Sequence, residues 1–452
     1  MIDRLLELAR ARADGADAIE RRSERTGLEF ESGRLKAASI TEESGTGLRV
    51  LSRGRVGLAG STAGDLSGLV DRALASAELG EVLPLGFPAR QSVPGVATHD
   101  RAAADAALPR LIAIGQELVE RLARDRCQVN VSIERVTGQT TVANTAGAHA
   151  QYAETGVTIG ADLRRIAGDD VLMVYDQWAA SGLPGAADLD ALVGSITERL
   201  DQALTVVEPP EGSLPVVFTP SGLAAILLPL EQALSGKAVV QGISPLGGRL
   251  GERICDAAVS LVDDPLIAGR PNSRPVDDEG VPSCRLALMD QGVLRAFIYD
   301  LETAARAGAA STGHGRRGIF GKPHAAYSNL ILGPLPDLRS PLPSPFSPGG
   351  ESGERRGSLG GGLISGIADG LIVDDLIGVG QGNVIGGAFS HPVALAYRVQ
   401  GGRITGRVKD AAVAGHVYEL LQRVGGWGDD GRWIGSRWSA SLLLEGVSVA
   451  GR

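Results

Sequence analysis

Three consecutive carboxylates form the acidic cluster of greatest interest for acid–base chemistry. Asp277, Asp278 and Glu279 come directly before Gly280 and an apolar run. Paired carboxylates can transfer protons or hold a metal ion. Acidic residues more commonly cap turns and face water, and that ordinary interpretation is the favoured one. A turn at Gly280 would hold these carboxylates between two strands.

A second segment places hydroxyl groups near an imidazole. It consists of Ser311, Thr312, Gly313 and His314. A hydroxyl activated by a neighbouring base is the basis of nucleophilic catalysis, but closeness in sequence does not establish that two side chains meet. The alternative is an ordinary turn.

Metal-binding patterns are missing from the sequence. There is no HExxH or HExxxH motif, and none of the six histidines is three to five residues from another. No helix therefore presents a zinc-binding pair beside a general base, although a site gathered from distant loops stays open. The three cysteines form no CxxC pair, which fits a reducing cytoplasm and excludes a disulfide framework. Cys255 and Cys284 are expected to be small apolar residues of the interior.

Composition narrows the class of partner. The chain has 452 residues and a formal charge of −9, so nucleic acid is not expected as a ligand. Aromatic residues make up only 4%, which argues against a surface that stacks on bases. The N-terminus lacks the apolar segment of a signal peptide, and no apolar run approaches the length of about 20 residues that a membrane helix needs. We expect a soluble, cytoplasmic protein without membrane contact.

The elements that must position these residues fall into two halves, which predicts an α+β fold. Residues 1–205 are expected to form an N-terminal α+β domain with mixed sheets. A helix, several strands and a helix recur there, which suggests an internal duplication of 1–80 and 105–205. Pro209, Pro210 and Gly212 indicate a linker over 206–215, followed by a β-rich C-terminal domain over 216–452. Its Pro/Ser/Gly-rich segment 334–362 is predicted to be a flexible insert.

The order of several segments resembles the TldD/PmbA family, whose members are also called modulators of DNA gyrase. The resemblance begins with SGLAAILLPLEQALSGKAVVQGISPLGGRLGERICD at 221–256. It continues through RPVDDEGVPS, GVLRAFIYDLETAARAG and STGHGRRG, and GTGLRVLSRGRVGLAGST at 45–62 extends it toward the N-terminus. Nearly the whole chain is covered, apart from 334–362.

This resemblance implies a cytoplasmic peptidase built from two related subunits. The TldD-type subunit carries HExxxH and a C-terminal cysteine that bind the metal, whereas the TldE/PmbA-type subunit does not. In this chain Leu227 and Leu228 stand where the first His and the Glu would be, and Gln232 stands where the second His would be. The C-terminal segment GSRWSASLLLEGVSVAG has no cysteine. The chain therefore resembles the subunit without the metal motif.

The resemblance sets the site and partner predictions. We predict no catalytic residue, metal or cofactor in this chain, and expect zinc in a TldD-type partner. Asp278, Glu279 and residues 311–314 become candidates for a substrate channel or a subunit interface. A heterodimer with the TldD-type subunit is expected, a homodimer when the chain is alone, and peptides as substrates.

Three classes of function remain open at this point. The first is the noncatalytic half of a TldD/TldE-type metallopeptidase that acts on peptides in proteolysis or peptide maturation. The second is a stand-alone peptide-binding or scaffold protein. The third is a hydrolase with a Ser or Thr nucleophile. Whether the chain has any enzymatic activity of its own is left open.

Overall fold

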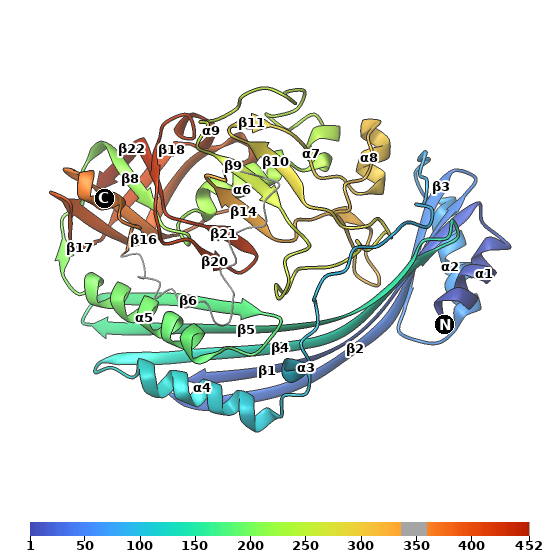
Figure 1. Ribbon diagram of the computed structural model, residues 1–452, viewed down its shortest axis with the longest axis horizontal. Helices are drawn as coiled ribbons and strands as arrows, with labels where there is room; N and C mark the ends of the chain where they lie inside the picture. Colours follow the sequence, from blue (N-terminus) through green and yellow to red (C-terminus); the bar gives the residue numbers. More distant parts are fainter. Residues whose placement is uncertain (336–358, 452) are drawn as a thin grey trace.

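A curved, six-stranded antiparallel sheet dominates the first half of the chain (Figure 1). The computed structural model describes residues 1–335 and 359–451. The strands pair in the order β3-β2-β1-β4-β5-β6. Their bounds are β1 (Gly15–Glu31), β2 (Arg34–Ser52), β3 (Arg55–Ser61), β4 (Cys127–Asn144), β5 (His149–Ala167) and β6 (Asp170–Ala180).

Helices cover one face of this sheet at its two ends. They are α1 (Ile2–Arg10), α2 (Leu66–Glu78), α3 (Arg101–Ala104), α4 (Leu108–Leu122) and α5 (Ala186–Ala203). Side chains two apart along a strand share a face. In β1, Ala16 and Ala18 pack with the apolar sides of α1 and α2, and Leu28 and Phe30 pack with α4. Strand β1 therefore packs against helices at both ends of the sheet, because apolar residues lie near both of its ends on the same face.

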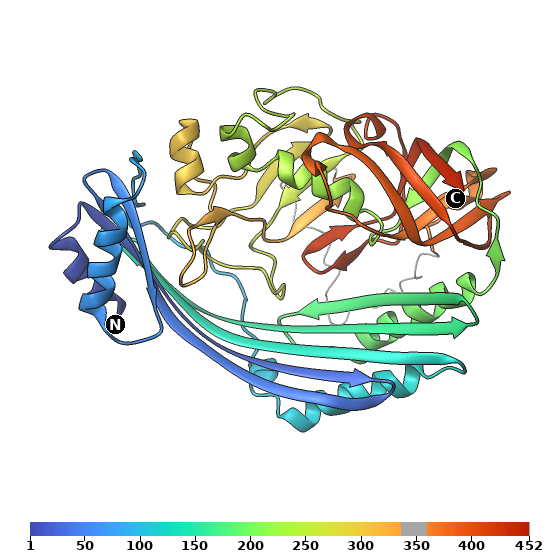
Figure 2. The same ribbon diagram turned by 180° about the vertical axis from the view of Figure 1, so that it is seen from behind.

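The element order helix, three strands, helix occurs twice in the first half. The first set is α1-β1-β2-β3-α2, and the second is α4-β4-β5-β6-α5. The first strands of the two sets, β1 and β4, lie side by side in the middle of the sheet (Figure 2). The expected order of elements is therefore present, while the duplication and its boundaries stay an interpretation.

The expected linker contains less irregular backbone than its composition indicates. Strand β7 (Val206–Val207) lies inside 206–215, and β8 (Gly212–Phe218) begins there, so only 208–211 lies outside regular structure. Both strands join the large sheet of the second half. Pro209 and Pro210 interrupt the strands without ending the sheet, because neighbouring strands supply the pairing on either side.

The second half is β-rich, as predicted. Its eight-stranded sheet runs β15-β8-β22-β18-β16-β17-β7, and an extra pairing of β15 with β16 closes a ring. The remaining strands of this sheet are β15 (Asp369–Leu376), β16 (Ala388–Gln400), β17 (Arg403–Val408), β18 (Ala411–His416), β19 (Val424–Trp427), which pairs with β22, and β22 (Leu442–Gly451).

A second sheet and several short helices complete this half. The sheet order is β11-β10-β9-β14-β21-β20, from β9 (Ser260–Asp263), β10 (Leu286–Asp290), β11 (Val293–Leu294), β14 (Leu330–Gly333), β20 (Arg432–Ile434) and β21 (Arg437–Ser439). A two-stranded ribbon pairs β12 (Gly315–Arg316) with β13 (His324–Ala325). The helices are α6 (Ala224–Ala233), α7 (Gly236–Val240), α8 (Leu301–Ala307), α9 (Val417–Leu420), η1 (Leu363–Gly366) and η2 (Val384–Gly386).

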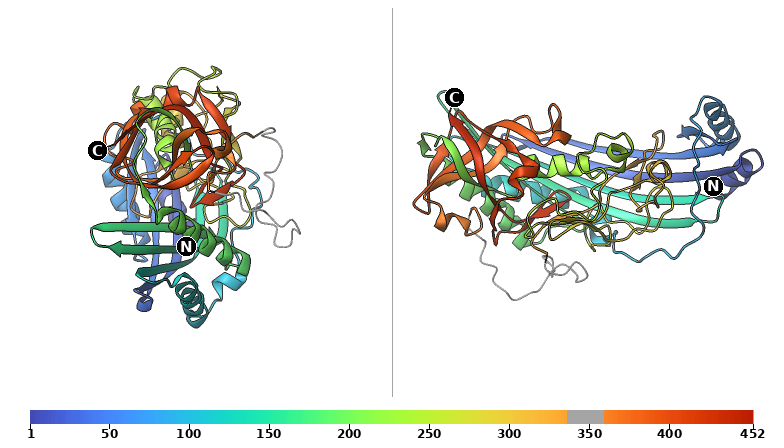
Figure 3. Two further views of the ribbon diagram at one scale, coloured as in Figure 1. Left: turned by 90° about the vertical axis from the view of Figure 1, so that its left-hand side faces the viewer. Right: turned by 90° about the horizontal axis from the view of Figure 1, so that it is seen from above.

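The two halves share a core and together form an elongated molecule (Figure 3). Buried side chains of α5 pack in one cluster with residues of the eight-stranded sheet, such as Ile372 of β15 and Tyr397 of β16. The Tyr397 hydroxyl donates to the backbone oxygen of Arg199, 2.9 Å away. The second half lies over the concave face of the sheet, opposite α4 (Figure 1).

Two sequence expectations concern segments that the structure covers only in part. Of the predicted insert 334–362, residues 336–358 lie outside the described residues. Leu359, at its C-terminal end, packs against the shared core. Within the described ranges, no helix is both long and apolar enough to span a lipid bilayer.

Candidate functional site

The predicted acidic turn at 277–280 exists, and it is held from within. Gly280 has a positive φ of 85°, and its N–H donates to the backbone oxygen of Asp277. One Asp277 oxygen accepts the backbone N–H groups of Glu279 and Val281, at 2.9 and 2.8 Å. The other accepts the N–H of Gly315, at 2.9 Å. This carboxylate therefore fixes the turn and ties it to the segment after His314.

Glu279 meets the sheet through Arg49 of β2. The Arg49 Nη1 lies 2.7 Å from the Glu279 Oε1, and Arg49 also makes a two-pronged pair with Asp17 of β1 at 3.1 and 2.5 Å. All three side chains are at most 2% exposed. The second Glu279 oxygen accepts the N–H of Leu301 at the start of α8. Glu279 is thus a buried link between sheet, turn and helix.

Asp278 makes a parallel link one residue away. Its Oδ1 lies 3.1 Å from the Arg21 Nη2, and its Oδ2 accepts the backbone N–H of Arg317 at 2.9 Å. The Arg317 side chain continues to Asp17, with Nη1 3.1 Å from Oδ1. We call this contact region, formed by 277–279 and 314–320 against β1 and β2, the junction.

Glycines in the sheet allow the junction to close tightly. A Cβ atom at Gly47 or at Gly60 would lie 2.6 Å from the carbonyl oxygen of Ile319. Such a distance is too short for a real side chain, so the backbone of 319 can rest on the sheet only where the strands lack a Cβ. Gly47 and Gly60 therefore serve this contact between the two halves.

His314 is buried and engaged, and its ring does not meet the neighbouring hydroxyls. Its Nδ1 is 2.8 Å from the Thr312 carbonyl oxygen, and its Nε2 is 3.1 Å from the Asp263 Oδ2. The Thr312 hydroxyl bonds the backbone of Tyr299 at 2.7 and 3.1 Å. A hydroxyl nucleophile needs its base within hydrogen-bond reach, and 311–314 does not provide that pair.

The remaining two residues of 311–314 also have structural partners. The Ser311 hydroxyl donates to the backbone oxygen of Tyr299, 3.2 Å away. Gly313 has a φ of 73°, where side chains are strained, and a Cβ there would lie 2.9 Å from the Pro282 carbonyl oxygen. The segment therefore folds around Tyr299 and the acidic turn, which brings its residues to the junction.

Burial dominates the electrostatics of the acidic turn. Burial raises the pKa of Glu279 to about 7, although Arg49 opposes the change. It also raises the pKa of Asp277 to about 6, against the opposing effect of Arg274. Burial has the same tendency at Asp278, but Arg316 and Arg21 outweigh it and hold the pKa of Asp278 below its usual value. The three adjacent carboxyls thus differ in their acid–base behaviour because their charged neighbours differ.

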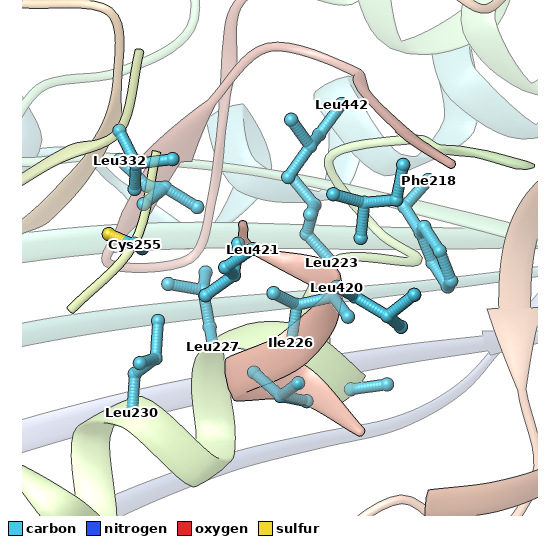
Figure 4. Packing of buried hydrophobic residues seen from close by; sticks show 14 of the residues in the cluster. Phe218, Leu223, Ile226, Leu227, Leu230, Cys255, Leu332, Leu420, Leu421 and Leu442 are labelled. Atoms are coloured by element: carbon cyan, nitrogen blue, oxygen red, sulfur yellow. The ribbon is translucent and has the colours of Figure 1, made fainter. Parts of the chain in front are cut away.

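The three positions predicted for a degenerate metal motif lie on α6. Leu227 is 2% exposed and packs with Ile226 and Leu421 in the core of the second half (Figure 4). Leu228 is half-buried beside Gly380, and Gln232 is exposed. The first and last positions of the motif therefore face different surroundings, the protein interior and the solvent.

The donor set of the described residues does not fit a zinc ion. Leu227 and Leu228 have no ligand atoms, and glutamine is a poor ligand beside imidazole and thiolate. In the portion of the chain that the structure covers, no group of three or more His, Cys, Asp or Glu side chains is arranged to hold a metal. The absence of metal from this chain stays a prediction for measurement.

A hollow on the helix-covered face of the sheet contains none of the candidate residues. It has a volume of about 770 Å³ and is open to solvent. Its lining includes Glu20, Glu24, Glu42 and Glu43, with His99 from the connection between α2 and α3. Glu20 and Glu24 already pair with Arg22 and Arg135 of this chain.

Sequence analysis missed the partners of the acidic turn in the sheet. Arg21 and Arg49 pair with Asp278 and Glu279, and Asp17 pairs in turn with Arg49 and Arg317. The available signal was a charged residue inside an apolar strand, as in GADAI and GLRVL. Buried charges are normally paired, so such residues predict a partner without naming it.

Models of known families match both halves of the chain. The model described as the PmbA/TldA metallopeptidase C-terminal domain matches 211–451, and domain 1 of the same metallopeptidases matches 16–77. The chain belongs to the PmbA/TldD family. The junction therefore connects two regions that are both typical of this family.

Relatives in the family are named as metalloproteases. One from Methanothermobacter thermautotrophicus is 29% identical over 64% of this chain and 60% of its own length. One from Archaeoglobus fulgidus is 23% identical over 88% of each chain. Against two others, a metalloprotease of Methanocaldococcus jannaschii and a TldD homologue of Haemophilus influenzae, the matched region spans only 43% and 42% of the relative.

Solved structures share the fold over 99% of the chain. TldE from Thermococcus kodakarensis superposes with a TM-score of 0.84 at 22% identity, covering 99% of both chains. A Thermotoga maritima protein whose name refers to modulation of DNA gyrase gives the same TM-score, identity and coverage. At this identity the likeness establishes the α+β architecture and no more.

Proposed function

We propose that this chain is the metal-free, TldE/PmbA-type subunit of a two-subunit metallopeptidase that acts on peptides in the cytoplasm. The main support for this proposal is the sequence of α6, where Leu227 and Leu228 stand in place of a metal ligand and a general base. Leu227 belongs to the core and Gln232 faces outward, so this helix stabilises the fold without offering a set of ligands.

The junction supports a positioning role for the other candidate residues. Asp278, Glu279 and His314 are at most 1% exposed, and each is held by partners from a different element. Such groups cannot touch a substrate directly, but they fix the concave sheet against the second half. We infer that they set the shape of the surface on which the partner and the peptide assemble.

The hydrolase alternative loses its support at 311–314. Both hydroxyls there bond the Tyr299 backbone, and the His314 ring is held between Thr312 O and Asp263. The scaffold alternative would be favoured if the chain failed to assemble with a TldD-type chain. Membership of a metallopeptidase family favours a peptide-processing complex over a scaffold.

Co-expression with a TldD-type chain tests the proposal. Alone, the chain is expected to form a homodimer, to hold no stoichiometric zinc and to cleave no peptide. Together, the two chains should form a 1:1 complex that contains zinc and has peptidase activity. Light scattering, elemental analysis and cleavage of a peptide mixture measure these three properties. A matched control changes both HExxxH histidines of the partner, which should remove zinc and activity but leave the complex intact.

Two results would contradict the proposal. About one tightly held zinc ion per isolated chain would show that the ligands are here after all. A monomer that ignores every TldD-type chain offered would favour the scaffold alternative.

A further inference from the structure

One long edge of the curved sheet has no partner strand. Strand β3 pairs with β2 only over 46–52, so β2 forms the edge of the sheet over 34–45. In the described part of the chain, no other strand pairs with this segment, and residues 34–44 are all exposed. Unpaired backbone groups along such an edge are a template for another strand. We call residues 34–45 the free edge.

The pairing of β2 with β1 determines which backbone groups of the free edge point outward. The backbone oxygen of Leu51 accepts the N–H of Asp14, just before β1, so Leu51 bonds toward β1. The direction alternates from residue to residue in an antiparallel strand, and this ladder is regular over 37–51. The N–H and C=O groups of even-numbered residues such as Ala38 and Ile40 therefore point away from β1, at the free edge.

The free edge also carries apolar side chains on one face of the sheet. Residues directly opposite each other in a ladder share a face. Leu35, Ala38 and Ile40 lie opposite buried residues of β1 on the helix-covered face. Leu35 is nevertheless 40% exposed and Ile40 is 61% exposed. An added strand with apolar side chains on the same face would cover them.

Charges divide the free edge into a basic end and an acidic end. Arg34 and Lys36 lie at one end, and Glu42 and Glu43 lie at the other. Lys36 is the extra residue of a β-bulge, so the regular part of the edge begins at Ala37. Charges at an edge oppose most added strands. An antiparallel copy of the same strand brings each basic end beside an acidic end, whereas a parallel copy would place like charges together.

We propose that the free edge binds the free edge of a second copy of this chain, antiparallel and about a two-fold axis at Ser39. In this register Ala38 lies opposite Ile40 of the second copy, and the two exchange backbone hydrogen bonds on both sides of the axis. The basic end of each copy approaches the acidic end of the other. Such a contact is isologous, because the same patch serves both copies. The homodimer rests on the proposed function, and the inference assigns its contact surface.

Ile40→Pro tests the pairing in the isolated full-length chain. Proline lacks the N–H that Ile40 would donate to the second copy, and an edge strand tolerates proline where that N–H faces solvent. Light scattering over a range of concentrations measures the dissociation constant of the dimer, and circular dichroism checks the fold. Each copy loses a hydrogen bond across the axis, so the dissociation constant should rise by about tenfold or more. Ile40→Ala keeps the N–H and is the matched control, which should dimerise nearly as the wild type does.

Ser39→Lys and Ser39→Glu test the register, and they keep the proposal testable if Ile40→Pro does not fold. Either variant alone places two like charges across the axis and should weaken the dimer. An equimolar mixture of the two variants places opposite charges there and should restore the dimer. Ser67→Lys is the matched control, because Ser67 is an exposed serine of α2, and it should leave the dimer unchanged.

Three results would overturn the proposal. A monomeric wild type would leave the free edge to a different occupant, such as an extended peptide. A dimer that is equally stable in folded Ile40→Pro would place the contact elsewhere, and one that is equally stable in both Ser39 variants would exclude this register. The last two results leave the homodimer and the proposed function intact, because zinc content and peptidase activity of a complex with a TldD-type chain judge that function separately.

Discussion

Helix α6 and the junction contrast in the use of polar residues. At α6, the positions that the family resemblance predicts for a metal motif hold Leu227, Leu228 and Gln232, and the helix packs as an ordinary core element. At the junction, charged residues are buried and paired across elements far apart in the sequence, with Arg49 and Glu279 separated by 230 positions.

This contrast shows how the chain uses its buried charged residues. Side chains that could take part in acid–base chemistry are present, but their partners are other residues of the same chain. Asp277, for example, bonds three backbone N–H groups and has no oxygen turned to solvent. A buried ion pair contributes more to a specific geometry than to net stability, because desolvation offsets much of the attraction. The junction is therefore better suited to positioning the two halves than to catalysis.

The largest expected effect comes from Arg49→Met. The change leaves Asp17 and Glu279 buried without their shared cation. Removing one partner of a buried pair typically costs about 3–5 kcal/mol. We expect the free energy of unfolding, measured with urea, to fall by about this amount.

Arg295→Met is the control for this prediction. Arg295 pairs with Asp290 at 3.3 Å, but the two side chains are 49% and 32% exposed. Exposed pairs contribute about 0–1 kcal/mol. Similar losses for the two variants would show that the junction is no stronger than a surface pair, and the contrast with α6 would disappear.

The contact between Arg49 and Glu279 also shows what the sequence could and could not predict. The sequence predicted the α+β class, the β-rich second half and the turn at Gly280, because periodicity and turn residues are local signals. It could not pair Glu279 with Arg49, because nothing local fixes a contact between residues so distant in sequence. The register of β1 with β2, which places Asp17 opposite Arg49, had to be known first.

The linker and the His314 segment show the same limit. Two prolines suggested a break at 206–215, yet pairing with β17 and β22 makes strands of most of this segment. A hydroxyl and an imidazole two residues apart left it open whether their side chains meet, and the Tyr299 backbone holds the Thr312 hydroxyl elsewhere. In both places a distant partner decides the local conformation.

Glu279→Gln tests the electrostatics of the junction through pH, with a smaller expected effect. Burial raises the pKa of Glu279 to about 7, above the value of about 4.3 in an unfolded chain. Between these values the native state holds a proton that the unfolded state has lost. The contribution of Glu279 to stability is therefore complete at low pH and decreases as the pH rises from about 4 to about 7. The glutamine variant lacks this decrease.

Urea unfolding at several pH values between 4 and 8 measures the difference between the two proteins. We expect the stability of the wild type, relative to Glu279→Gln, to decrease with rising pH across the window. Both proteins share the opposing contribution of Asp278, whose pKa is lowered, so the comparison removes it. A relative stability that rises with pH would mean that Arg49 outweighs burial and that Glu279 is an ordinary ionised partner.

The smallest effect on the chain itself is expected from Gln232→Arg. Gln232 is exposed on α6, where arginine is a good helix former, so the free energy of unfolding should change by no more than about 0.5 kcal/mol. If α6 lies beside a peptide-binding chamber shared by the two subunits, the same change should reduce the peptidase activity of a complex with a TldD-type chain. Gln241→Arg, an exposed glutamine just after α7, is the control and should leave both quantities unchanged. Lost stability at Gln232 would mean that α6 is packed on all sides, and unchanged activity of the complex would place the chamber elsewhere.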